Sequence, residues 1–389
     1  MQAINFAAPR MLLAAGGAVR QIAEVLGKFG LSRPVIVTDP FLGSSALVQR
    51  CLGPLAEAGM AAPVFSETVP DPTDTVVDQG VQYLGQGTFD CLIGFGGGSP
   101  IDTAKAAAIL AAGTGHIRQY KVPVPADRAK LPVIAIPTTA GTGSECTRFT
   151  VITDTERDEK MLIAGLGALP LAAIVDFELT YTVPPRTTAD TGVDSLTHAL
   201  EAYVSRRANP FADALALSAM DLIGRHLRTA FTEPHNARAR EGMMLGATQA
   251  GLAFSNSSVA LVHGMSRPIG AHFHVPHGLS NAMLLPAVTR FSVGMAQARY
   301  AEAARRIGLA RPDDPDEVAT SKLVDGLQEL NRTLDVPSPR AYGIDGRAWA
   351  AKLELMAEQA LASGSPANNP RVPDKAEIIR LYQEVWGGK

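Results

Sequence analysis

The chain has 389 residues, of which 46% are hydrophobic and 19% charged, and its formal net charge is −3. This length accommodates two domains, each with a sizeable core. A balanced charge without a basic tract argues against nucleic acid and against a membrane surface as partners. The three cysteines form no Cys-x-x-Cys pattern, which favours a reducing compartment, and no stretch has the character of a signal peptide or a membrane span. We therefore expect a cytoplasmic protein.

Short apolar runs alternate with helical patterns through the first half of the chain. The expected strands lie at about 34–39, 62–66, 89–95, 131–136 and 171–176. The expected helices lie at about 17–29, 42–58 and 73–86, and from Ser99 onward. A polar turn between 147–152 and 160–164 predicts a β-hairpin. Alternation of this kind is typical of a parallel sheet with crossover helices, so we predict an α/β domain.

A glycine-rich turn follows the strand at 89–95 and leads through Gly97 and Gly98 into a helix that starts near Ser99. Glycines let the backbone approach a ligand closely, and the free N–H groups at a helix start attract negative charge. The turn therefore predicts a pyrophosphate site. Because Ser99 stands where the third glycine of G-x-G-x-x-G would be, an ordinary strand-to-helix turn is the alternative.

Two more stretches end strands at the same edge of the predicted sheet. Asp39 follows the strand at 34–39, where a carboxylate can bind a ribose diol and repel a 2′-phosphate, which favours NAD over NADP. The alternative for Asp39 is a turn aspartate before Pro40. The loop at 137–145 offers hydroxyls and amides where open α/β folds bind ligands, and a flexible linker is its alternative.

From Arg186 onward the periodicity is helical almost throughout, and the Pro184-Pro185 pair marks a boundary. The sequence therefore predicts an α/β domain over residues 1–185 and an all-α domain over 186–389. The expected helices lie at about 187–206, 210–229, 237–255, 277–289, 295–307, 316–333, 346–361 and 374–384.

One carboxylate and three imidazoles in this second half have spacings that suit a metal ion. Asp194 and His198 are four residues apart and project from one helix face. Prolines and glycines separate His263 from His277, so we expect His263 to end one helix and His277 to lie in the first turn of the next. Such a shell suits Fe²⁺ or Zn²⁺ better than Mg²⁺ or Ca²⁺. The alternative is that these histidines lie on the surface or are satisfied within a core. We expect the active site between the two domains.

The glycine-rich run at 96–105, the loop at 137–145 and the Asp194, His198, His263 and His277 set resemble the iron-containing (group III) alcohol dehydrogenases, in the family's order and over nearly the whole chain. The resemblance implies a Rossmann-like α/β N-terminal domain and an all-α C-terminal domain, the two-domain architecture of dehydroquinate synthase. It also implies Fe²⁺ on those four side chains, with Zn²⁺ as the alternative ion. The implied reaction is NAD(P)-linked interconversion of a small alcohol and its aldehyde, in a homo-oligomer that is at least a dimer.

By the same resemblance, the residues that bind the cofactor are Asp39, Gly97, Gly98, Ser99, Asp102, Thr138, Thr139, Thr142 and Lys160. The two glycines and Ser99 would hold the pyrophosphate, with Asp102 at the nicotinamide side. The three threonines would line the nucleotide, and Lys160 would reach the ribose. Asp39 matches the family's acid that selects NAD(H) over NADP(H).

The chain departs from the family's pattern at two positions. Many members have a histidine four residues after the third metal ligand, where this chain has Arg267, which cannot exchange a proton near neutrality. Either His274 or water would then relay the proton, or the proton would leave through the cofactor ribose. A further interpretation is that Arg267 binds a carboxylate or phosphonate of the substrate, which would make the enzyme a hydroxy-acid or acidic-aldehyde dehydrogenase; a salt bridge within the helical domain is its alternative. The second departure is Asp71, where relatives often carry Asn.

Three other functions remain open. A zinc-dependent polyol dehydrogenase of the glycerol type is disfavoured by the fourth ligand, His277. A lyase of the dehydroquinate-synthase type would need a basic phosphate-binding cluster in the helical half, where the arginines are scattered. A non-catalytic binding protein would leave the four ligands and the nucleotide loop unexplained. Phe149, Leu252 and Phe254 either narrow the substrate pocket or belong to the core.

Overall fold

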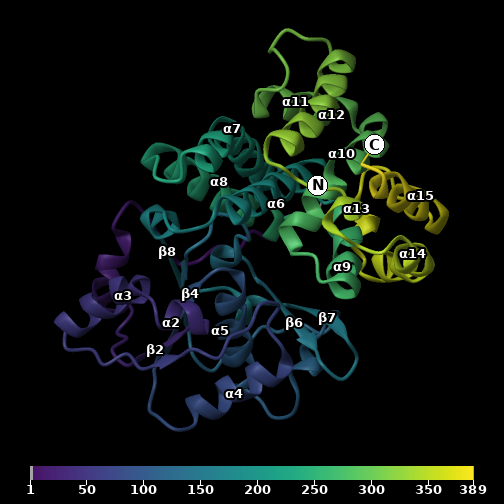
Figure 1. Ribbon diagram of the computed structural model, residues 1–389. Helices are drawn as coiled ribbons and strands as arrows, with labels where there is room; N and C mark the ends of the chain where they lie inside the picture. The colour runs from purple at the N-terminus through teal and green to yellow at the C-terminus, as the bar shows by residue number, and fades with distance from the viewer. Residues whose placement is uncertain (1–2, 389) are drawn as a thin grey trace. The chain divides into compact units, whose positions relative to one another are not determined.

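A computed structural model describes residues 3–388 of the chain (Figure 1). The chain divides into two compact units between Val183 and Pro184, next to the proline pair at which the sequence suggests a boundary. The first unit is Phe6–Val183, and the second combines residues 3–5 with residues 184–388. No helix within residues 3–388 is long and apolar enough to cross a membrane.

The first unit is built on a six-stranded parallel sheet in the order β1-β8-β5-β4-β2-β3. Its strands are β1 (Met11–Ala14), β2 (Pro34–Val37), β3 (Val64–Phe65), β4 (Cys91–Gly96), β5 (Val133–Pro137) and β8 (Ala172–Val175). The four central strands are buried along their whole length, which explains why they read as continuous apolar runs rather than alternating ones. The predicted α/β class is confirmed.

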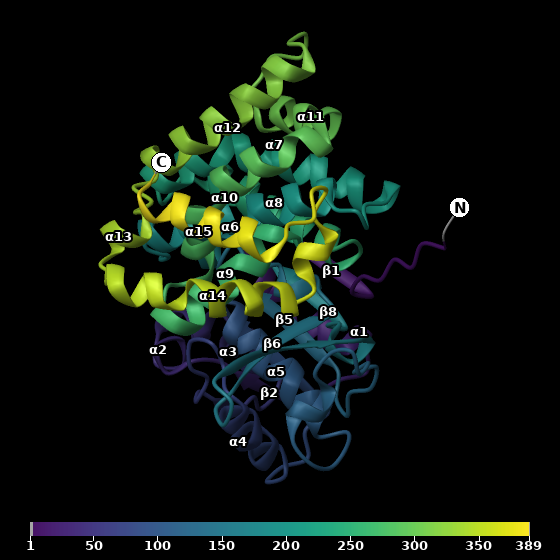
Figure 2. The same cartoon turned by 90° about the vertical axis from the view of Figure 1, so that its right-hand side faces the viewer.

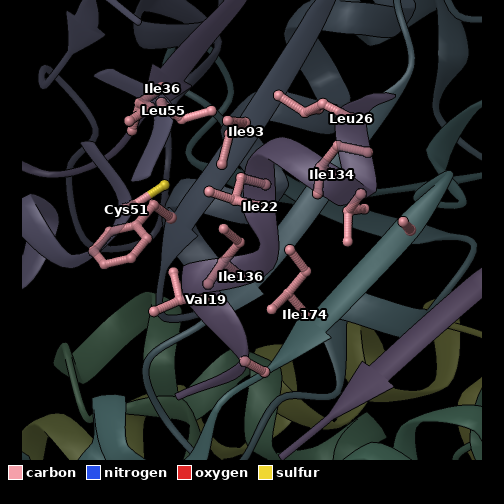
Figure 3. Packing of buried hydrophobic residues seen from close by; sticks show 14 of the residues in the cluster. Val19, Ile22, Leu26, Ile36, Cys51, Leu55, Ile93, Ile134, Ile136 and Ile174 are labelled. Atoms are coloured by element: carbon pink, nitrogen blue, oxygen red, sulfur yellow. The ribbon is translucent and has the colours of Figure 1, made fainter. Parts of the chain in front are cut away.

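Helices cover both faces of this sheet. On one face, Ile36, Ile93 and Ile134 point toward Ile22 and Leu55, as Figure 3 shows. These side chains come from α1 (Ile22–Lys28), α3 (Ala46–Glu57) and the strands, so the face is covered by α1 and α3. The opposite face packs against α4 (Asp74–Leu84) and α5 (Gly98–Leu110). The result is three layers, with one apolar core on each side of the sheet.

Short elements complete the first unit. The predicted hairpin is present as β6 (Phe149–Asp154) paired antiparallel with β7 (Glu159–Ala164). The remaining elements are α2 (Pro40–Gly43) and the 3₁₀ turns η1 (Ala18–Gln21), η2 (Ile117–Tyr120), η3 (Ser144–Cys146), η4 (Leu166–Ala168) and η5 (Phe177–Thr180).

The strand order creates a place for a ligand in the first unit. From β2 the chain moves outward to β3, and then returns to β4 on the other side of β2. The connections therefore diverge between β2 and β4, and in open α/β sheets ligands bind in the crevice that this divergence leaves at the carboxyl ends of the strands. Asp39 follows β2, and Gly97 follows β4.

The second unit consists of helices, among the residues described. The long helix α6 (Pro185–Val204) packs against α7 (Pro210–Thr232), α8 (Ala237–Ser255) and α10 (His277–Ser292), which lie around it in Figure 2. The other elements are α9 (Leu261–Phe273), η6 (Val293–Met295), α11 (Gln297–Ile307), α12 (Asp316–Thr333), α13 (Pro339–Tyr342), α14 (Gly346–Ala362), η7 (Ser365–Asn368) and α15 (Lys375–Trp386). The predicted all-α character of this half is confirmed.

One helix differs from the prediction. His263 is the third residue of α9 rather than the end of a helix, and α9 continues through Pro268 and Gly270 to Phe273. An internal proline removes one backbone hydrogen bond and normally breaks or kinks a helix. Here nine of the ten residues from Leu261 to Gly270 are buried, so packing outweighs the local breakers. The expected separation of His263 from His277 by a helix boundary is correct.

The core under α3 generates a prediction for stability. Leu55 is fully buried against the sheet, and truncating it to alanine leaves a cavity as well as lost apolar contact. We expect Leu55→Ala to lower the free energy of unfolding by about 2–5 kcal/mol. Urea denaturation followed by circular dichroism measures this change. Leu166→Ala is the control, because Leu166 is 54% exposed, and an equal loss in both variants would contradict the assignment of the core.

Candidate functional site

Four side chains of the second unit converge on one point. The carboxylate Oδ1 of Asp194 lies 3.9 Å from Nε2 of His198, 3.6 Å from Nε2 of His263 and 3.8 Å from Nε2 of His277. All four potential ligand atoms lie within 4.8 Å of one another. The structure therefore brings together the whole set that the spacing suggested, from three different helices.

Local packing explains how the three helices reach this point. Asp194 and His198 are one turn apart on α6, and both are buried. His277 is the first residue of α10, directly after Pro276, as expected. A Cβ atom on Gly278 would collide with the backbone carbonyl of Asp190, so only glycine lets the start of α10 approach α6 this closely. That approach carries the His277 imidazole to the Asp194 carboxylate.

Glu201 orients one of the imidazoles, and the sequence reading did not identify it. Its buried carboxylate accepts hydrogen bonds from the backbone N–H of Ala260 at 2.8 Å and of Val262 at 2.6 Å. It also lies 2.7 Å from Nδ1 of His263. Glu201 follows His198 by three residues on α6, a spacing that could have pointed to it. The pairing makes Nδ1 the donor and leaves Nε2 of His263 free to accept a positive charge.

Asn281 is a second residue that the sequence reading missed. It lies one turn after His277 on α10 and is fully buried. Its Nδ2 donates to Oδ1 of Asp194 at 2.6 Å and lies 3.2 Å from Nε2 of both His263 and His277. Its amide therefore contacts three of the four converging side chains.

The electrostatics of this cluster favour a cation. Burial alone would raise the pKa of Asp194, but the adjacent imidazoles of His198, His277 and His263 hold it well below its usual range. Burial alone would lower the pKa of His263, but its bonds to Asp194 and Glu201 raise it to about 8. Two buried carboxylates thus attract positive charge to one place, and a bound metal ion would supply it in place of a proton.

The donor set can be tested against a divalent transition metal. Ligand atoms about 2.0–2.2 Å from a tetrahedral ion are roughly 3.3–3.6 Å from one another. The observed 3.6–3.9 Å separations from Asp194 Oδ1 are a few tenths of an ångström wider, and the four ligand atoms, all within 4.8 Å of one another, would draw together on a bound ion. Three imidazole nitrogens and one carboxylate oxygen suit iron or zinc rather than magnesium or calcium. The side chains present therefore fit such an ion.

An aromatic wall lies beside the cluster. The ring of Phe254, on α8, stacks on the imidazole of His198 with centroids 4.3 Å apart. Phe254 thus packs directly against a converging side chain rather than elsewhere in the core. His198 in turn stacks on His263 at 4.5 Å, so these rings form one continuous stack.

In the first unit, the glycine turn and the 137–145 loop lie against each other. The N–H of Thr138 donates to the carbonyl of Gly96 at 2.8 Å, and a Cβ atom on Gly98 would lie 2.9 Å from Cγ2 of Thr142. A Cβ on Gly97 would meet only Thr139, at 3.6 Å or more. The amides at the start of α5, next to Ser99, therefore face a cradle bounded by the predicted threonines, which fits the pyrophosphate of a dinucleotide.

Buried polar contacts keep these two loops in place. The Nζ of Lys105, fully buried on α5, donates to Ser144 Oγ at 3.0 Å, Thr147 Oγ1 at 3.3 Å and the carbonyls of Thr147 and Phe149 at 3.1 and 2.9 Å. Asp102, predicted on the nicotinamide side, accepts from Ser144 Oγ at 2.6 Å and from the N–H of Val151 at 2.9 Å. Asp102 therefore already links α5 to the loop and to β6.

Asp39 and Lys160 each have a structural partner. One carboxylate oxygen of Asp39 caps α2 by accepting from the N–H of Leu42 at 2.9 Å. The alternative role of Asp39 as a turn aspartate is thus present, and the second oxygen is not used by that cap. Lys160 Nζ forms a 2.7 Å ion pair with Asp71, the residue that stands where relatives often carry Asn. Release or sharing of this pair would be needed for Lys160 to reach a ribose.

Arg267, at the position of the family's relay histidine, and His274, its suggested substitute, lie in different surroundings. His274 is exposed, adopts the left-handed conformation that ends α9, and does not belong to the group of four converging side chains. Arg267 lies one turn after His263 on α9 and is partly buried. A role for His274 in the relay stays a prediction.

Comparison with known proteins identifies the family. Residues 9–177 match the iron-containing alcohol dehydrogenase family, and residues 188–386 match the C-terminal domain described for the Fe-containing alcohol dehydrogenase family. Together these matches cover both units of the chain.

Individual relatives agree over nearly the full length. An NAD-dependent methanol dehydrogenase of Bacillus methanolicus is 36% identical over 98% of this chain and 99% of its own. An NADPH-dependent butanol dehydrogenase of Clostridium saccharobutylicum is 35% identical over 99% and 98%. A crystal structure of 1,3-propanediol oxidoreductase superposes with a TM-score of 0.94 at 33% identity, covering 99% of this chain and 100% of that one. The chain belongs to the iron-containing alcohol dehydrogenase family of oxidoreductases.

Proposed function

We propose that this enzyme uses Asp194, His198, His263 and His277 to hold Fe²⁺ and interconverts a small alcohol and its aldehyde with NAD(H). The observation that carries the proposal is the convergence of four ligand atoms within 4.8 Å, on a donor set that fits the ion. Zn²⁺ suits the same donors, and metal analysis after anaerobic purification distinguishes the two ions.

The iron, the nicotinamide cofactor and the protein side chains would have different roles in the reaction. When bound, iron would supply Lewis-acid chemistry toward the alcohol or aldehyde oxygen, and the nicotinamide would supply hydride chemistry. The chain's own task is to hold these groups. The second unit provides the ligand set and the apolar wall of Phe254, and the first unit provides the amides at the start of α5. Gly97, Gly98 and Ser99 would bind the pyrophosphate, and Thr138, Thr139 and Thr142 would border the nucleotide.

Glu201 is assigned a positioning role within this function. Its carboxylate lies 2.7 Å from Nδ1 of His263, and two backbone N–H groups hold the carboxylate in place. Partners of this kind fix the tautomer and the ring orientation of a metal-binding histidine and raise its basicity. Glu201 would therefore act through His263 and not on the substrate.

Asp39 supports a preference for NAD(H) over NADP(H). It lies beside the divergence point of the sheet, and its cap to α2 leaves one carboxylate oxygen for a ribose hydroxyl. A 2′-phosphate at the same place would meet a like charge. The dimer, the cytoplasmic location and the contacts of Asp102 and Lys160 with the cofactor stay predictions.

The ligand assignment predicts a split between turnover and cofactor binding. We expect His263→Ala and His277→Ala each to abolish metal-dependent reduction of small aldehydes while leaving NADH affinity nearly unchanged, because the two functions reside in different units. Metal content, NADH oxidation and NADH fluorescence titration provide the measurements. His272→Ala is the matched control, since His272 lies on α9 but bonds to Gln359 instead. Full activity in both ligand variants would refute the assignment.

The role of Glu201 predicts a graded effect on metal binding. We expect Glu201→Gln to weaken iron or zinc affinity by about 10–100-fold, because the amide preserves the shape but not the charge that supports His263. Titration against a competing chelator measures the affinity. Glu302→Gln is the control, because Glu302 pairs with Arg306 on α11, away from the cluster. Unchanged affinity in Glu201→Gln would remove Glu201 from the account.

The cofactor assignment predicts a change in specificity at Asp39. We expect Asp39→Gly to raise the kcat/KM ratio of NADPH to NADH roughly tenfold or more, because a like-charge contact is removed. Glycine also caps helices adequately, so little stability should be lost. Asp39→Asn keeps the cap and removes only the charge, and should shift the ratio in the same direction. If steady-state kinetics give the same ratio in all three proteins, Asp39 does not select the cofactor.

A further inference from the structure

Arg267 has an unusual environment for a charged side chain. It is partly buried on α9, and among residues 3–388 no hydrogen bond or ion pair connects its guanidinium to another group. Guanidinium stays charged in proteins and has five N–H donors. A charge withdrawn from water without hydrogen-bonded partners is costly, so such groups normally have a counter-ion.

Lys105, which is fully buried in the first unit, is a cation whose donors all have acceptors nearby. Lys105 Nζ donates to four oxygens at 2.9–3.3 Å. Arg267 has only a longer-range attraction to Glu201, which partly opposes the lowering of its pKa by burial. Glu201 itself already accepts from Ala260, Val262 and His263. The Glu201 carboxylate therefore does not act as a hydrogen-bond acceptor for Arg267.

The sum of the charges at the cluster, with a divalent ion bound, contains one positive charge that is not balanced. Asp194 and Glu201 together carry two negative charges, which balance a divalent ion at the cluster. Asp190, one turn before Asp194, is paired with Arg186. Arg267 therefore adds a positive charge that the described side chains beside the cluster do not neutralise, and an anion would complete the balance.

The position of Arg267 suits a substrate group. It follows His263 by four residues, so the two side chains leave the same face of α9, with Cβ atoms roughly 5–6 Å apart. From Leu261 to Gly270, Arg267 is the one residue whose side chain keeps some exposed surface. An anion on Arg267 would thus lie about one helical turn, roughly 5 Å, from the His263 side of the cluster.

We propose that Arg267 binds an anionic group at the far end of the substrate, so that the enzyme prefers short aldehydes and alcohols that carry a carboxylate or a comparable anion. This rests on the proposed function, since it assumes that the four-residue cluster binds the reacting oxygen. The guanidinium presents paired donors in the geometry of a carboxylate. A chain of two or three carbons between the carbonyl carbon and the anion spans the distance. Arg267 is a specificity residue in this scheme and transfers no proton.

A pair of substrates matched in length tests the proposal. In 4-oxobutanoate, a carboxylate replaces the terminal methyl of butanal. We expect the iron-loaded enzyme to have a higher kcat/KM for 4-oxobutanoate with NADH. In Arg267→Gln this value should fall about 30–100-fold, mainly through KM, while that for butanal changes less than about threefold. Arg267→Lys should recover part of the loss, because it keeps the charge without the paired donors.

Arg290→Gln is the control for removing an arginine, because Arg290 pairs with Glu384 on the surface of the same unit. An equal loss for both substrates in Arg267→Gln and Arg267→Lys would overturn the proposal and make Arg267 structural or general to the reaction. An unchanged ratio of the two substrates would overturn it as well.

A binding measurement separates this proposal from the proposed function. Calorimetric titration of the enzyme–NADH complex with 4-hydroxybutanoate and with butan-1-ol requires no turnover. We expect the hydroxy acid to bind at least about tenfold more tightly, and Arg267→Gln to remove that difference. If the enzyme reduces neither aldehyde, the proposed function fails, and the titration still decides whether Arg267 binds the anion. Equal binding of the acid and the alcohol by the unmodified enzyme would overturn the proposal.

Discussion

The buried carboxylate of Asp194 and the three imidazoles around it form the interaction on which the helical unit depends. A carboxylate that is only 2% exposed needs positive charge and hydrogen bonds around it. The helices α6, α9 and α10 meet this need by bringing three imidazoles to the carboxylate, and Asn281 donates a hydrogen bond to its Oδ1. The glycine at position 278 permits that convergence, because a Cβ atom there would collide with the backbone carbonyl of Asp190 on α6.

In the α/β unit the corresponding constraint is backbone proximity. The amides at the start of α5 are useful to a ligand only if no side chain covers them and if the neighbouring loop stays close. Gly97 meets the first condition, and Gly98 allows the Thr142 side chain of the neighbouring loop to come close. The buried ammonium of Lys105 and the carboxylate of Asp102 meet the second, by fastening α5 to the loop through Ser144. Polar groups in this core therefore position the cradle as well as stabilising it.

Prediction from the sequence succeeded where the signal is local. Five of the six sheet strands, the hairpin and most helices follow from periodicity and turn residues, since each element's pattern lies within its own few residues. The edge strand β1 was not predicted. The four converging side chains could also be named, because five of the eight histidines lie at positions 198, 263, 272, 274 and 277 and the family's motifs are distinctive. The interpretation failed at α9, where Pro268 and Gly270 suggested a break but burial on nearly all sides maintains the helix.

The sequence by itself determined the classes of the two halves, the cradle glycines and the identity of the four converging residues. Only the tertiary structure decided that Glu201 supports His263, that Asn281 contacts the cluster and that Lys160 pairs with Asp71. It also decided that Arg267 has no partner among the described residues while Lys105 has four acceptors. The physical reason is that these contacts join residues up to 89 positions apart. A hydrogen bond or an uncompensated charge depends on which distant groups the fold brings within about 3 Å, and no local pattern encodes that.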